Sequence, residues 1–373
     1  MNRLLLIAFF LLPMTAGECL GWGLTGHKLV TDRAVRLLPT ELQDFYWANR
    51  HVLADLCVHP DLRKDWDRAE GPKHYIDLEG YPDDLPQRRE DAIRRFGMDK
   101  LTDSGWVPWN TQEVYQNLVS AMRRKDYPDI LRLSGDLSHY VADLHVPLHT
   151  TVNYDGQLTT DTGVHARFES RLVDLFPDAL PFEPKPAARI QDVPTRLWAI
   201  LLASTTAVDD VFESDRRSTG ADPADGYSIA KARQNFGPLA ARRLNDAAHE
   251  VASFWYTAWV EAGRPKLPWA DFSALVKPKT YPYGELLFYA GRYTQEIPPD
   301  WPLIVRDAFR RIEDYLRLAT PVRVAKVHWS QTARDPALRV TALETTAPVD
   351  EKACVQALRR LLVEVKVKFS AEE

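Results

Sequence analysis

Apolar residues recur at spacings of three and four along most of the first 265 positions. An apolar helical face begins just after His27 and runs from Leu29 to Leu38. The same spacing continues in four further segments that we expect to be helical: 111–125, 127–144, 192–212 and 228–262, the last interrupted at Gly237-Pro238. Polar, proline-rich stretches separate these segments. The pattern predicts a mostly helical N-terminal region.

The pattern changes near Pro265. Residues 266–283 are rich in proline and aromatic side chains and are expected to form a linker. Beyond them, we expect helices, β-branched strands and a final extended stretch: helices over 307–318 and 351–363, strands over 322–329 and 338–345, and an extended segment over 365–369. The sequence therefore predicts a small α+β extension over 266–373, whose role no motif identifies.

The first residues have the organisation of a signal peptide. Met1-Asn2-Arg3 is positively charged, and the apolar run Leu4–Leu12 is too short to span a bilayer. Cys19-Leu20-Gly21 supplies small residues at the −3 and −1 positions of a cleavage site, although cleavage after Ala16 is an alternative. We expect 1–21 to be removed and the protein to be secreted or periplasmic.

Cleavage after Gly21 would make Trp22 the N-terminal residue, in the segment Trp22-Gly-Leu-Thr-Gly-His27. A free α-amine has a pKa near ~8, so it can lose its proton and bind a metal at mild pH. The alternative is that Trp22 is simply an aromatic residue of the core.

Composition and net charge limit the kinds of partner that the chain is expected to bind. The chain has 373 residues, 45% of them hydrophobic, and a net charge of −5, which gives no basic surface for duplex nucleic acid. After the leader, no apolar run is long enough to span a membrane. The remaining cysteines, Cys57 and Cys354, can pair in an oxidising compartment, but the sequence does not indicate that they meet.

Six of the ten histidines lie in four short segments that also carry carboxylates. In the densest segment, His139 and Asp143 are four residues apart, which places them on one face of a helix. Pro147 is expected to end that helix and to let His149 approach from a loop. His165 and Glu169 repeat the spacing of four.

Two more candidates lie upstream: Asp61, with Asp55 and Asp65 as alternatives, and His74. A single pair of this kind is more often a surface ion pair than a metal site. The repetition of the spacing favours metal binding, and imidazole with carboxylate but without thiolate fits a catalytic zinc site.

In their order along the chain, these residues resemble the superfamily that joins the zinc-dependent phospholipases C of bacteria with the zinc single-strand-specific nucleases. The resemblance covers about residues 22–265 and implies an all-α fold with three zinc ions at the bottom of a cleft. It implies three ligand sets: Asp61, His74, His139 and Asp143 for one zinc; His149, His165 and Glu169 for a second; Trp22 (amine and carbonyl), His27 and the bridging Asp143 for the third. His145 matches a recurrent histidine that is not a ligand, and we expect it in the core or behind the ligands.

The resemblance implies hydrolysis of a phosphodiester, in which Asp61 holds zinc and orients or deprotonates the attacking water. Arg63 or Lys64 is a candidate phosphate contact, with the alternative that both are solvated surface charges. Clustered zinc ions suit this chemistry because they activate water and neutralise developing charge. The chain contains no Gly-x-Ser-x-Gly motif for a serine nucleophile.

The substrate is expected to be a single-stranded nucleic acid or a phospholipid. The spacing of Trp22 and His27 matches the nucleases, and Tyr75 and Asp77 fall where nucleases carry a base-stacking aromatic and a base-reading carboxylate. Glu169 instead matches the phospholipase ligand. The balance favours a nuclease; a phospholipase C is the alternative, and a non-catalytic zinc-binding or interaction protein is a third.

Overall fold

The computed structural model describes residues 22–64, 67, 69–175, 180–218, 228–272, 275–276, 324–332, 335–345 and 368–371. The expected signal peptide, Cys354 and the helices expected over 307–318 and 351–363 lie outside the described residues. Within them, no helix is both long and apolar enough to cross a membrane.

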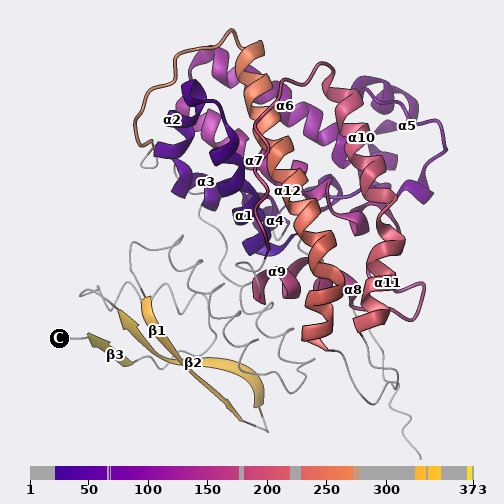
Figure 1. Cartoon of the computed structure of the whole chain (residues 1–373), viewed down its shortest axis with the longest axis vertical. Helices are drawn as coiled ribbons and strands as arrows, with labels where there is room; N and C mark the ends of the chain where they lie inside the picture. Colours follow the sequence, from indigo (N-terminus) through magenta and orange to yellow (C-terminus); the bar gives the residue numbers. More distant parts are fainter. Residues whose placement is uncertain are drawn as a thin grey trace, which may run out of the picture.

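Helices form the N-terminal part of the chain, as the apolar spacing predicts (Figure 1). The α-helices are α1 (Gly23–Leu37), α2 (Thr40–Ala48), α3 (Arg50–Leu56), α4 (His59–Arg63), α5 (Arg89–Ser104), α6 (Val107–Arg124), α7 (Tyr127–Asp143), α8 (Val164–Ala166), α9 (Leu172–Leu175), α10 (Val193–Thr205), α11 (Val208–Ser218) and α12 (Ile229–Glu261). Shorter turns are the 3₁₀-helices η1 (Gly71–Lys73), η2 (Leu78–Gly80) and η3 (Pro147–Thr150) and the π-helical η4 (Arg167–Arg171).

Helix α7 lies at the centre of the bundle and contacts α1, α3, α4, α6 and α12. The Asp126 side chain caps its N-terminus by accepting a hydrogen bond from the backbone N–H of Asp129 at 3.3 Å, and Pro128 occupies its first turn. Every residue from Leu133 to Asp143 is buried. A helix buried on all sides has no solvent to satisfy its polar side chains, so those side chains need partners inside the protein.

Helix α12 is continuous, which corrects the interruption expected at Gly237-Pro238 (Figure 1). Proline removes one intrahelical hydrogen bond, here to the carbonyl of Gln234. The flanking Phe236 and Leu239 are buried, and α12 packs along α1, α6, α7 and α11. Burial of this length of apolar surface outweighs the loss of one hydrogen bond.

The single helical segment expected over 192–212 is instead two helices, α10 and α11. The hydroxyls of Ser204, Thr205 and Thr206 bond back to carbonyls of the preceding turn, at 3.2, 3.0 and 3.1 Å. Such side chains compete with the backbone and favour the end of a helix. The pattern of apolar residues does not reveal this break.

Three strands form a separate sheet near the C-terminus (Figure 1). Strands β1 (Val324–Thr332) and β2 (Asp335–Thr345) are antiparallel, and β2 is parallel to β3 (Lys368–Ala371). The strands expected over 322–329 and 338–345 are therefore confirmed within the described residues, and β3 covers the last two residues of the extended segment expected over 365–369.

Candidate metal centre

His139 and Asp143, from the last turns of α7, form the middle of the site. Both are fully buried, and Nε2 of His139 lies 3.2 Å from Oδ2 of Asp143. The other ring nitrogen of His139, Nδ1, donates to the carbonyl of Cys57 at 2.8 Å. This bond leaves the Nε2 lone pair facing Asp143, which is the arrangement that metal-binding histidines commonly have. Helix α7 ends at Asp143 itself, four residues before Pro147, so Pro147 is not what ends it.

Asp61, from α4, and His74, from the turn after η1, meet this pair. Nδ1 of His74 lies 2.9 Å from Oδ2 of Asp143 and 3.0 Å from Nε2 of His139. Oδ1 of Asp61 lies 3.6 Å from both of these histidine nitrogens. Of the three aspartates left open by the sequence, the structure brings Asp61 to the site, while Asp65 lies outside the described residues.

His27, from α1, completes this side of the cluster. Its Nε2 lies 3.5 Å from Oδ1 of Asp143 and 3.9 Å from Oδ2 of Asp61, and its ring stacks on that of His139. Trp22 is fully buried, and its indole N–H donates to the carbonyl of Ala142 at 3.0 Å, next to Asp143. His27 and Trp22, the first described residue, therefore both lie at the cluster.

Close packing against Trp22 requires a glycine at position 26. A Cβ on Gly26 would lie 2.7 Å from Cβ of Trp22, closer than real atoms approach. A larger residue would displace Trp22 from its place beside Ala142. In Trp-x-x-x-Gly-His, the glycine is thus required for packing, while the tryptophan and the histidine are the candidate ligands.

His149, His165 and Glu169 form a second group. Nε2 of His165 lies 2.6 Å from Oε1 of Glu169, and Nε2 of His149 lies 3.7 Å from Oε2. Nδ1 of His149 is also 3.7 Å from Oδ1 of Asp143, so Asp143 lies between the two groups. Glu169 lies in the π-helical turn η4, and such turns often occur at functional sites.

The donor atoms of both groups fit divalent cations. Within the described residues, ring nitrogens or carboxylate oxygens that are buried in the cluster lack a well-formed hydrogen bond in six side chains: His27, Asp61, Asp143, His149, His165 and Glu169. Most of the distances given above lie between 2.9 and 3.9 Å. Two ligands at about 2.0 Å from one tetrahedral zinc are separated by about 3.3 Å, in the middle of this range. Buried carboxylate oxygens without a hydrogen-bond donor, such as Oδ1 of Asp143 and both oxygens of Glu169, are costly, and a bound cation would offset that cost.

Electrostatics keep several of these imidazoles neutral, the form in which histidine binds a metal. Burial, reinforced by His139, lowers the pKa of His27 to about 3, and burial lowers the pKa of His165 to about 4. Burial also lowers the pKa of His149. Burial raises the pKa of Asp61, but Lys64 and the neighbouring histidines outweigh it, so that the pKa of this carboxyl lies below its ordinary value.

The structure separates the two candidate phosphate contacts. Lys64 is buried in the cluster, with Nζ 2.7 Å from Oδ1 of Asp61. Arg63 points away from the cluster and binds Asp136 at 2.9 Å and Glu70 at 3.1 Å. Neither cation is therefore a freely solvated surface charge.

Tyr75 and Asp77 follow His74 on an extended segment and are half-buried. The Ile76 N–H donates to the carbonyl of His149 at 2.9 Å, which ties this segment to the second ligand group. Opposite lies Gly105, with φ of 73°; a Cβ there would come within 2.5 Å of the Tyr75 ring. The absence of a side chain at Gly105 therefore leaves room for Tyr75, a role that sequence spacing did not indicate.

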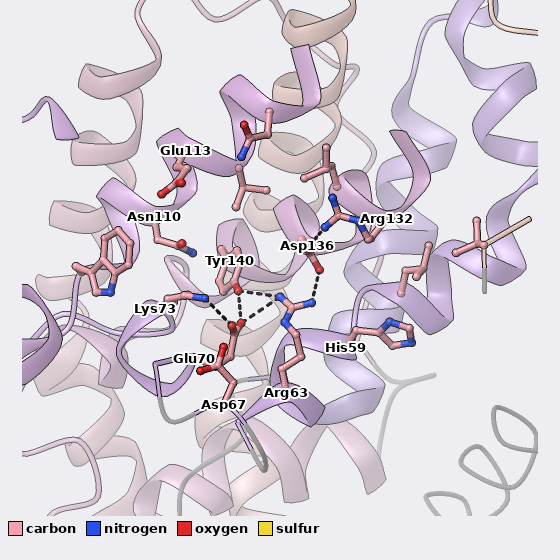
Figure 2. A pocket seen from close by; sticks show the side chains of 16 residues that line it. His59, Arg63, Asp67, Glu70, Lys73, Asn110, Glu113, Arg132, Asp136 and Tyr140 are labelled. Carbon is pink, nitrogen blue, oxygen red and sulfur yellow. Dashed lines mark hydrogen bonds and ion pairs between the residues drawn. The ribbon is translucent and has the colours of Figure 1, made fainter. Parts of the chain in front are cut away.

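Behind His74 lies a cavity of about 480 Å³ between η1, α4, α6 and α7. Figure 2 shows Arg63, Lys73 and Tyr140 converging on Glu70 at its wall, with Asp136 bound to Arg63. Sequence analysis missed Glu70, although it precedes His74 by four residues, the spacing of the two ligand pairs that were recognised. By contrast His145 is buried away from the three ligand groups, with Nδ1 donating to the carbonyl of Val141 at 2.7 Å, as expected for a core residue.

Comparison with models of known protein families finds no match to the chain, and comparison with curated proteins also finds none.

Proposed function

We propose that the protein is a zinc-dependent phosphodiesterase. One observation carries the proposal: buried imidazoles and carboxylates from α1, α4, α7, η3, α8 and η4, without a thiolate, converge around Asp143. Structural zinc sites usually contain thiolates, whereas catalytic sites combine histidine with carboxylate. The resemblance to the phospholipase C and nuclease superfamily, which rests on the same residues, supplies the reaction class.

Under this proposal, Asp61, His74, His139 and Asp143 hold one zinc ion, and His149, His165 and Glu169 hold a second. When bound, the ions would lower the pKa of water and neutralise negative charge on the phosphoryl group. The chain's own residues supply orientation. Asp61 is ionised and accepts a hydrogen bond from the attacking water, while Lys64, beside it, contacts a phosphate oxygen. We assign that contact to Lys64, because its Nζ lies inside the cluster, 2.7 Å from Asp61, whereas Arg63 points away from the cluster to Asp136 and Glu70.

A third zinc ion requires a free amine at Trp22, together with His27 and Asp143. We therefore propose export and cleavage after Gly21. Protein that begins at Trp22 is expected to bind one more zinc ion than protein with two residues added before it, because the extension turns the amine into a peptide nitrogen. Elemental analysis after gel filtration counts the ions, and equal stoichiometry would contradict this assignment.

The substrate that we favour is single-stranded DNA or RNA. Tyr75 offers a half-buried ring for stacking on a base, and Asp77 a carboxylate for reading its edge. Phospholipase C activity is the second candidate, because Glu169 is the ligand type of that branch. A non-catalytic zinc-binding protein is the remaining alternative.

The proposal is tested with mature protein loaded with zinc, assayed on single-stranded nucleic acid and on phosphatidylcholine vesicles. His149→Ala is the inactive control, since it removes one ligand. Nucleotide release that is lost in the control would support the nuclease. Release of phosphocholine would support phospholipase C instead. Zinc binding without either activity would favour the non-catalytic protein.

A further inference from the structure

Glu70 lies on the far side of His74 from the metal ligands. Its side chain is 1% exposed, and Oε1 is 3.7 Å from Nε2 of His74. The opposite ring nitrogen, Nδ1, is the one that faces Asp61, His139 and Asp143. His74 is therefore placed between a carboxylate on one side and the ligand cluster on the other.

Three side chains fix the Glu70 carboxylate in this place (Figure 2). Lys73 donates to Oε2 at 2.8 Å, Arg63 donates to Oε1 at 3.1 Å, and the Tyr140 hydroxyl also donates to Oε1. Arg63 is itself held by Asp136 at 2.9 Å. Charge-assisted bonds of this kind are short and directional, so Glu70 is a rigid acceptor.

We infer that Glu70 is a positioning residue for His74. A fixed carboxylate attracts the proton of the imidazole to Nε2, which leaves the lone pair on Nδ1, directed at the cluster. Without Glu70, the ring loses this electrostatic preference between its two tautomers. This inference rests on the proposed metal centre, and it concerns how well that centre is formed.

The chain offers a matched control in Glu250, on α12. It is also buried, pairs with an arginine (Arg196 Nε to Oε2, 3.0 Å), and lies 3.9 Å from the Nε2 of a histidine, His249. Neither Glu250 nor His249 belongs to the metal-ligand groups found among the described residues. Substitution there removes a buried ion pair of the same kind without touching the cluster.

The experiment compares wild type, Glu70→Gln and Glu250→Gln by zinc titration against a chromophoric chelator, and by melting of the zinc-free proteins. We expect Glu70→Gln to weaken zinc binding about 10- to 100-fold, the usual effect of removing such a partner. Glu250→Gln should bind zinc within about twofold of wild type, although it too loses a buried pair. A purely structural role for Glu70 would lower the melting temperature and leave zinc affinity unchanged, which would overturn the inference.

Tyr140→Phe guards against a Glu70 variant that does not fold. It removes one donor to Glu70 and keeps the buried ring, so we expect a smaller loss of zinc affinity, about three- to tenfold. Unchanged affinity in Glu70→Gln, or in Tyr140→Phe if Glu70→Gln does not fold, would refute the positioning role. If wild type itself binds no zinc, the proposed metal centre fails instead, an outcome distinct from the others.

Discussion

Removal of zinc should lower the stability of the protein by an amount that its ligand groups allow us to work out. The group around His139 and the group of His149, His165 and Glu169 share no residue, so under the proposed function they would hold at least two ions. A ligand at 100 times its dissociation constant stabilises the folded state by about 2.7 kcal/mol per site, or about 5 kcal/mol for two. For a domain of roughly 150–250 residues, each kcal/mol moves the melting temperature by about 2–4 °C.

We therefore expect the melting temperature, measured by calorimetry, to be about 10–20 °C higher with zinc than with a chelator. Glu169→Gln should halve that difference, because it removes a ligand of one group only. The zinc-free melting temperature should change little, since glutamine has the same shape and introduces no buried charge. Glu213→Gln, in an exposed ion pair on α11, serves as the control and should retain the full difference. A full zinc effect in Glu169→Gln would refute the assignment of the second group.

Three further predictions concern the surroundings of the cluster. Burial, with repulsion from Glu79, raises the pKa of Asp77 to about 6. The folded protein therefore binds this proton more tightly than the unfolded chain, and the free energy of unfolding should decrease as the pH rises from 4 to 6. Asp77→Asn should then be about 1 kcal/mol more stable than wild type at pH 8 but not at pH 4 in urea denaturation, and an equal gain at both would contradict the reasoning. Arg63→Met removes the cation that joins Glu70 to Asp136, leaving Glu70 with Lys73 and Asp136 with Arg132, and should cost about 2 kcal/mol, whereas the exposed Arg94→Met should cost under about 1 kcal/mol; similar losses would count against the network. Gly105→Ala should cost at least about 2 kcal/mol in the same assay, because its Cβ meets Tyr75, while Gly71→Ala, with nothing within 4 Å, should be nearly neutral; equal effects would exclude this contact as the cause.

Ligand pairs within one helix were the part of the site that sequence predicted directly. The spacing of His139 and Asp143, and that of His165 and Glu169, places each pair on one face, and the structure brings both pairs together. Spacing carries no information on how separate segments meet. The hydrogen bond from Ile76 to His149 joins positions 73 residues apart, and no local pattern indicates it.

The same distinction between local pattern and tertiary contact applies to the fold. Apolar spacing identified the main helices, because burial of one face is what stabilises them. It failed at Pro238, where packing along α12 outweighs a local helix breaker, and at Thr206, where hydroxyl groups end a helix whose apolar pattern continues. Both failures are cases in which tertiary contacts or side-chain hydrogen bonds override the periodicity.

The π-helical turn at Arg167–Arg171 makes the position of Glu169 sensitive to the number of residues in this segment. It accommodates a wider turn between His165 and α9, with α-helical segments on either side. Deletion of one residue within it would restore an ordinary α-helical turn and leave the flanking segments facing as they do. A deletion between His165 and Glu169 would shorten their spacing from four residues to three and turn Glu169 by about 100° relative to His165, although no ligand had been substituted. Proteins that keep every ligand but are one residue shorter here should therefore have lost the second ligand group.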